Sequence, residues 1–286
     1  MGMVRSAVWT DVLGNGHKQL VVVGEWMAPR IFSFQVDHFA EVATNLNKLH
    51  GWWRCVVATD VNGDGKPDLV MGNIGENFYL RPDSAHPVKL FIGDFDKTND
   101  QNEKILARSY EGKDVPVFLK REMTDQFPVL RKQNFKHADY AVKTVQELFG
   151  ADQVRKADVK LFDYNSSVVA INAGNGQFVI EKLPLETQLS SLNSILPVDV
   201  KGDGKYALLT GGNDFDFQPQ FGCLDANYGQ LLENNGKGVF SCMDQRKCGL
   251  DFRGAVRDIQ LINTKKGKRI LVLQNNEKPI LLQIKP

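Results

Sequence analysis

The chain has few of the residues and runs that mark the common catalytic and membrane classes. Its 286 residues include five histidines and four cysteines, and the sequence contains no HExxH pair, P-loop or GxGxxG fingerprint. No apolar run approaches the ~20 residues that a membrane-spanning helix needs. The formal net charge of +1 gives no overall field that would favour nucleic acid or an anionic membrane.

The cysteines form no CxxC pair, which argues against a zinc knuckle. Cys242 and Cys248 bracket the short segment MDQRK, so they could close a small disulfide loop or remain free. The first residues contain no apolar core of a signal peptide. Because the chain enters strand-like sequence at once, we expect it to be a piece of a longer protein.

Residues 60–72, DVNGDGKPDLVMG, carry the strongest motif in the chain. Oxygen-bearing side chains fall at positions 1, 3, 5 and 9 of a tight loop, Gly65 stands at position 6, and position 7 offers a backbone carbonyl. An all-oxygen cage of this kind suits Ca²⁺ better than Mg²⁺, which tends to keep its waters. The predicted ligands are Asp60, Asn62, Asp64, Lys66 through its carbonyl, and Asp68.

The same spacing opens an EF-hand, but two features argue against one. An EF-hand needs a bidentate Glu at position 12 and a helix on each side, whereas position 12 here is Met71. The residues after the loop form a short apolar run closed by Gly72, which is typical of a buried strand. The loop is therefore predicted to join two strands.

Weaker copies of this unit recur along the chain. The copy at residues 11–24 has Leu13 and Gln19 at positions 3 and 9, and the copy at residues 199–211 has Lys201 and Ala207 there. We expect neither of these loops to bind a cation, because the ligand side chains are lost. A fourth and weaker copy begins at Asp258.

A further loop, DFDKTNDQN, begins at residue 94. It offers fewer carboxylates than the loop at residue 60, so a second Ca²⁺ site here would be weaker. Its predicted ligands are Asp94, Asp96, Thr98, Asp100 through its carbonyl, and Asn102.

Loop, apolar strand and glycine repeat at intervals of roughly 35–60 residues, a pattern typical of a β-propeller. The predicted fold is an all-β propeller, partial or with about five blades, that forms one domain over residues 1–286. Residues 117–150 break the pattern, because Leu119, Met123 and Phe127 recur at helical spacing. We expect a small insertion of two short helices there, either a structural plug or a partner-binding lid.

The motifs GEWM, GWW, DVNGDGKPDLVMGNIGEN, IGDFD and LDANYG occur in this order. Together they resemble the FG-GAP/VCBS-repeat propeller proteins of the Bacteroidetes, which are large surface proteins often associated with an ASPIC/UnbV module. The calcium loop is also similar to those of the integrin α-subunit propeller. The resemblance implies an extracytoplasmic, calcium-stabilised propeller without established catalysis, here a partial propeller or one piece of a longer chain.

Aromatic residues in polar loops indicate a binding surface, because exposed rings stack on sugars or anchor proteins. The candidate ligand-binding residues are Phe215, Phe217, Phe221 and Tyr228. Trp52 and Trp53 are instead expected to fill space between blades. The predicted function is a binding or scaffold module for a protein or glycan; the alternative is a polysaccharide lyase or hydrolase that uses the central funnel.

Overall fold

The computed structural model describes residues 2–98, 102–133, 136–200, 202, 204–265 and 267–284. The chain forms two compact units, the first made of Met1–Arg81 and Asn165–Pro286 and the second of Pro82–Tyr164. The sequence predicted one domain with an insertion at about residues 117–150. The second unit is larger than that insertion because it also contains a sheet of its own.

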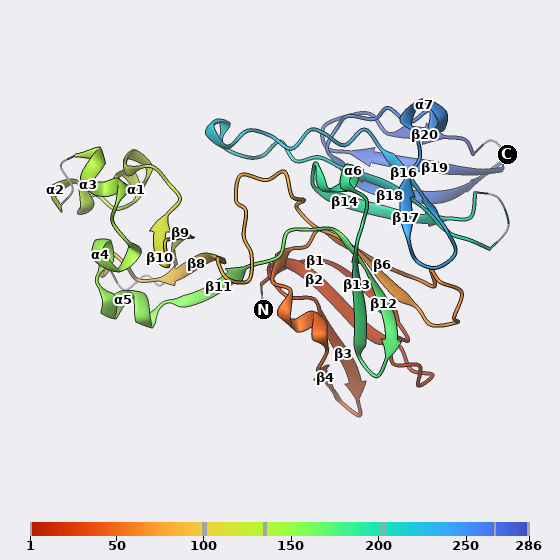
Figure 1. Cartoon of the computed structure of the whole chain (residues 1–286), viewed down its shortest axis with the longest axis horizontal. Coiled ribbons are helices and arrows are strands. Elements are labelled where there is room, and N and C mark those ends of the chain that lie inside the picture. The colour runs from red at the N-terminus through yellow and green to blue at the C-terminus, as the bar shows by residue number, and fades with distance from the viewer. Residues whose placement is uncertain are drawn as a thin grey trace. The chain divides into compact units, whose positions relative to one another are not determined.

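The first unit contains four antiparallel sheets (Figure 1), each built mainly from strands that follow one another along the chain. The first sheet has the order β1 (Met3–Thr10), β2 (Gln19–Met27), β3 (Arg30–Gln35), β4 (His38–Val42), with β5 (Gly51–Trp52) paired to β2. The second has the order β13 (Gln177–Lys182), β12 (Val168–Gly174), β7 (Asp68–Gly72), β6 (Cys55–Thr59).

The third sheet has the order β14 (Leu192–Val198), β15 (Ala207–Gly212), β16 (Gln230–Asn234), β17 (Phe240–Cys242). The fourth has the order β18 (Val256–Thr264), β19 (Gly267–Gln274), β20 (Ile280–Leu282). Short helical turns of this unit are η1 (Asn45–Lys48), α6 (Leu185–Gln188), η2 (Pro219–Phe221) and α7 (Gln245–Cys248).

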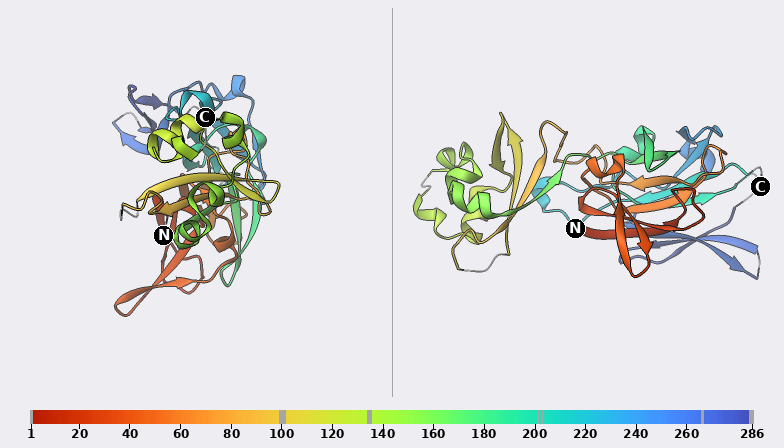
Figure 2. Two further views of the ribbon diagram at one scale, coloured as in Figure 1. Left: turned by 90° about the vertical axis from the view of Figure 1, so that its left-hand side faces the viewer. Right: turned by 90° about the horizontal axis from the view of Figure 1, so that it is seen from below.

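One strand of each sheet packs against the next sheet: β1 contacts β6, β6 contacts β14, and β14 contacts β18. We call these four the inner strands, and Figure 2 shows the sheets from two further sides. Small polar side chains join neighbouring inner strands, since Ser6 Oγ accepts from Val56 N and Ser194 Oγ accepts from Ile259 N. Apolar clusters fill the space between the sheets.

The prediction of a mostly β protein is confirmed. All five residues of β7 are buried, as expected for the apolar run that follows the loop at residue 60. Trp52 and Trp53 are both buried, which agrees with a packing role. The described residues form no closed ring of sheets, so the propeller and its number of blades stay a prediction.

The second unit consists of a four-stranded sheet and five short helices in its described part. The strand order is β10 (Lys113–Pro116), β9 (Glu103–Tyr110), β8 (Val88–Gly93), β11 (Asp158–Phe162). The helices are α1 (Lys120–Gln126), α2 (Leu130–Gln133), α3 (His137–Ala141), α4 (Val145–Phe149) and α5 (Ala151–Lys156).

The prediction of two helices was therefore wrong in number. Pro128 separates α1 from α2, and Gly150, at φ +88°, ends α4 just before α5 begins. Met123 and Phe127 are buried as the helical spacing predicted, whereas Leu119 is 63% exposed. The buried side chains of the helices and of β8 and β9 form one apolar core for this unit.

Candidate functional site

The loop at residues 60–68 connects β6 to β7, and its first carboxylate organises the turn. Asp60 accepts hydrogen bonds from Gly63 N at 2.7 Å and Gly65 N at 2.8 Å. Asp199 accepts equivalent bonds from Gly202 N and Gly204 N in the loop before β15. Because this arrangement occurs in both loops, the first Asp by itself does not distinguish a cation site from an ordinary turn.

Position 9 is different in this loop because Asp68 is a completely buried carboxylate. Its oxygens accept from Val61 N at 3.0 Å and Asn172 N at 2.8 Å. Burial raises the pKa of Asp68, although these two bonds lower it, and the nearby charges of Asp64 and Asp60 raise it further. A buried carboxylate with two like charges nearby gains stability from a cation.

Gln19 occupies position 9 in the loop between β1 and β2, and it is also buried. Its Nε2 donates to Asn15 Oδ1 at 3.3 Å and to the His17 carbonyl at 2.6 Å. Its Oε1 accepts from Leu13 N at 3.2 Å, which fixes the orientation of the amide. The side-chain N–H groups of Gln19 therefore face the oxygens at positions 5 and 7, where a cation would otherwise bind.

The donor chemistry of the loop at residue 60 fits Ca²⁺, since every predicted ligand atom is an oxygen. In the structure Asn62 Oδ1 accepts from Asp64 N, and Asp64 Oδ1 accepts from Lys66 N. Lys66 Nζ lies 3.8 Å from Asp64 Oδ2 and partly offsets its charge. The prediction of no cation at residues 199–207 rested partly on Lys201, which lies outside the described residues.

The loop at residue 94 holds one ligand that the sequence reasoning missed. Among the described His, Cys, Asp and Glu side chains, Asp94, Asp96 and Glu103 form the group whose ligand atoms all lie within 4.8 Å of one another. Glu103 Oε2 accepts from Phe95 N at 2.8 Å, as Asp68 accepts from Val61 N. The structure thus gives Glu103 the place that the spacing assigned to Asn102.

The loop at residue 94 is therefore one residue longer than the loop at residue 60. The feature of the sequence that could have identified Glu103 as a ligand is its place as an acidic residue at the start of the next strand, β9. Thr98 Oγ, another predicted ligand, donates to Asp96 Oδ1 at 2.7 Å. Asp100, predicted to contribute its carbonyl, lies outside the described residues.

The structure places the four predicted ligand-binding aromatics in two different environments. Phe217 contacts the ring of Phe78 at 5.1 Å, and Phe221 stacks on Tyr79 at 4.2 Å. Phe215 and Tyr228 are exposed by 46% and 39%. Phe217 and Phe221 therefore belong to an aromatic cluster, whereas Phe215 and Tyr228 offer accessible ring surface.

The cysteines carry no disulfide, so Cys242 and Cys248 are free thiols in this structure. The helices of the described residues are too short and too polar to span a bilayer.

Residues 11–71 match the family model described as an FG-GAP-like repeat. The matched segment includes the loops at residues 11–19 and 60–68, the strands from β2 to β6, and all of β7 except Gly72. It supports the FG-GAP assignment that the sequence motifs gave for this part of the chain. No curated protein matches the chain.

Proposed function

We propose that this chain is a calcium-stabilised FG-GAP propeller module that binds a protein or glycan outside the cytoplasm. The observation that carries the calcium proposal is the contrast between Asp68 and Gln19 at position 9. The amide of Gln19 supplies its own hydrogen-bond donors to the oxygens of its loop. The carboxylate of Asp68 supplies only negative charge, which a cation would balance.

The residues that would hold Ca²⁺ are Asp60, Asn62, Asp64, Lys66 through its carbonyl, and Asp68. A weaker second site would use Asp94 and Asp96 together with Glu103. An ion that binds the folded state alone stabilises it by RT ln(1 + [L]/Kd), or about 2.7 kcal/mol at 100 times Kd. Extracellular calcium modules bind the ion at roughly 10⁻⁴ to 10⁻³ M, so a site of that class would be occupied only outside the cytoplasm.

The binding role is supported by accessible aromatic surface at Phe215 and Tyr228 in the first unit. Arg253 lies over the Tyr228 ring at 4.8 Å, which leaves a mixed cationic and aromatic surface. Such surfaces suit both sugar rings and protein anchors.

The calcium proposal is tested by thermal unfolding in Ca²⁺ and in chelator. We expect Ca²⁺ to raise the midpoint of the parent chain and to have little effect on Asp64→Ala. The matched control is Asn15→Ala, which removes the position-5 side chain from the loop with Gln19. It should lower the midpoint equally with and without Ca²⁺. A parent midpoint that chelator leaves unchanged, in protein shown to contain no Ca²⁺, would refute the proposal.

A further inference from the structure

The sheets in the middle of the first unit are apolar on both faces. In β15, Leu208 packs in one cluster with Val70 of the second sheet. The next residue, Leu209, packs in another cluster with Val272 of the fourth sheet. Because side chains alternate between the two faces along a strand, one face of the third sheet meets the sheet before it and the other meets the sheet after it.

The first and fourth sheets are the two ends of this series. Among the described strands, the first sheet packs against the second, and the fourth packs against the third. Each end sheet therefore has one face on which no other sheet of this unit packs. We call these two surfaces the free faces.

The free face of the first sheet carries large apolar side chains. Leu20 in β2 lies opposite Trp9 in β1 and Phe32 in β3, so these three side chains share a face. Trp9 is 49% exposed. Val21 and Ile31, which alternate with them, are completely buried on the face that meets the second sheet.

Two further rings extend this surface toward the outer strands. Phe39 in β4 lies 6.0 Å from the ring of Trp9 and 5.2 Å from the ring of Phe34 in β3. Phe34 is 58% exposed and Phe39 is 49% exposed. Contiguous exposed apolar surface of this kind marks an interaction site.

The free face of the fourth sheet is aliphatic. Ile270 and Val272 in β19 are buried against the third sheet, so Leu271 between them points to the opposite face. Leu271 lies opposite Leu281 in β20, which is 57% exposed. By its pairing with the inner strand, Leu271 corresponds to Leu209 of the third sheet, the residue that faces the following sheet.

The two free faces are the two halves of one kind of junction. Leu20 corresponds to Leu208, since each residue directly follows position 9 of its loop. Within the chain, the face that carries Leu208 meets the preceding sheet, and the face that carries Leu209 meets the following sheet. The free face of the fourth sheet is thus of the type that packs on the free face of the first.

A polar link between inner strands is also present at the open end. Ser194 Oγ accepts from Ile259 N of the next inner strand at 2.9 Å, and Ser6 makes the same link from the first sheet to the second. Asp258 stands at this position in β18, directly after the register shift. Its carboxylate can accept more hydrogen bonds than those it receives from its own strand. The corresponding donor in β1 is the backbone N–H of the exposed Ala7, the residue after Ser6.

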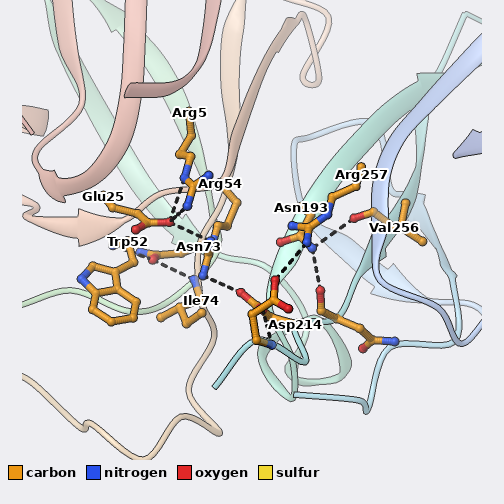
Figure 3. A network of polar contacts seen from close by, with 12 residues as sticks. Arg5, Glu25, Trp52, Arg54, Asn73, Ile74, Asn193, Asp214, Val256 and Arg257 are labelled. Carbon is orange, nitrogen blue, oxygen red and sulfur yellow. Dashed lines mark hydrogen bonds and ion pairs between the residues drawn. The ribbon is translucent and has the colours of Figure 1, made fainter. Parts of the chain in front are cut away.

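Ion pairs also cross the junctions within the chain (Figure 3). Arg54 of the second sheet donates to Glu25 of β2 at 2.7 Å and to Asp214, just after β15, at 2.9 Å. All four inner strands border one cavity of about 340 Å³. The sheets are therefore arranged around a common centre rather than in a flat stack, and a further sheet at either end would continue the same curve.

We propose that the fourth sheet of one chain packs on the first sheet of a second copy of this chain, and that two such contacts close a ring of eight sheets. A second copy is the partner because each chain carries both halves of the junction, so a two-fold axis buries every free face at once. Two sets of four sheets give eight, within the typical range of about four to eight blades. The inference rests on the proposed propeller and adds the interface that completes it.

Sedimentation equilibrium of the full chain tests the proposal. We expect a mass twice the 32.1 kDa of one chain. A monomer at ~100 µM, where even a Kd of ~10 µM would pair most chains, would overturn it. Polymers that grow with concentration would overturn the closed ring, because head-to-tail contacts that do not close form filaments.

Two variants test which faces meet. Leu281→Glu and Trp9→Lys each place a charge on one free face and should each give monomers. Their far-UV spectra should match that of the parent chain, because both side chains are exposed in a single chain. An equimolar mixture should recover dimers, since one junction is then native and the other pairs opposite charges. Dimers that persist in Leu281→Glu, or a mixture that stays monomeric, would refute the head-to-tail contact.

The matched control is Val142→Glu, which adds the same charge at a side chain that is 74% exposed in the second unit. It should remain dimeric. Asp64→Ala changes a loop of the second sheet and should also remain dimeric, so the calcium proposal and this one can fail independently. Monomers in Val142→Glu would mean that the loss of dimers does not report on the free faces, and would overturn the assignment.

Discussion

At the scale of single residues, buried polar side chains connect loops that lie far apart in the sequence. Asn213 is fully buried, and its Oδ1 accepts from Ser190 Oγ and Asn227 N. Its Nδ2 donates to the carbonyls of Asn227 and Arg253. One amide therefore ties together loops that follow β15 and precede β18, and it does so from a positive φ of 78°.

We predict that Asn213→Ala destabilises the first unit by about 2–4 kcal/mol, because several buried groups lose their partners at once. The control is Asn175→Ala, which changes another Asn at positive φ, 52°, but in an exposed turn. Its cost should stay near the ~1–2 kcal/mol of the left-handed backbone alone. Thermal midpoints of the two variants measure the difference. Equal losses would mean that the hydrogen bonds of Asn213 contribute nothing.

At the scale of elements, paired strands are held by cross-strand contacts as well as by their backbone. Arg30 in β3 makes two hydrogen bonds to Glu41 in β4, through Nε and Nη2. The hydrogen bond from Arg30 lowers the pKa of Glu41. A carboxyl group with a lowered folded-state pKa stabilises the protein above its unfolded value of ~4.3, and this contribution is lost as pH falls through the folded value.

Glu41→Gln should therefore lower stability by up to ~1 kcal/mol at pH 7, the range of partly exposed ion pairs. The difference from the parent chain should shrink as the pH falls below about 4 and vanish below the folded-state pKa of Glu41, because this carboxyl group is then protonated in the folded and the unfolded chain alike. Thermal midpoints across this pH range are the measurement. Glu277→Gln, an exposed change in the turn after β19, is the control. A difference that persists unchanged at pH 2 would exclude the ion pair as its cause.

At the scale of the whole molecule, the chain contains two units with separate cores. The second unit is inserted between β7 and β12, which are neighbouring strands of one sheet, with Val70 opposite Val169. Its core is built on Met123, Phe127 and Leu130, all fully buried. Cooperative unfolding is expected within each core but not necessarily across both.

We predict that calorimetry resolves two unfolding transitions. Met123→Ala should lower one of them by the equivalent of about 2–5 kcal/mol, the usual cost of a buried cavity. Leu208→Ala, in the core of the first unit, should lower the other. Asp64→Ala should change the Ca²⁺ response of the transition that Leu208→Ala affects. A single transition that both core variants shift equally would contradict the division.

Short-range chemistry determined what the sequence alone could predict. The Asp–Gly loops and the apolar run of β7 follow from contacts within about a dozen residues, and the loop at residue 60 forms as its spacing indicates. The helical face of Met123 and Phe127 was visible for the same reason. The number of helices was not visible in the sequence. Pro128 and Gly150 divide this segment into more and shorter helices than the apolar spacing indicated.

Only the tertiary structure decided which distant residues meet. Arg54 is separated from Glu25 by 29 residues and from Asp214 by 160, so no local pattern could connect them. Glu103 reaches the loop at residue 94 because that loop is one residue longer than the spacing rule assumed. β7 pairs with β12 although the whole second unit lies between these two strands in the sequence. Packing of the inner strands also brings Arg5, Arg54 and Arg257, which come from three separate sheets, to the lining of one cavity.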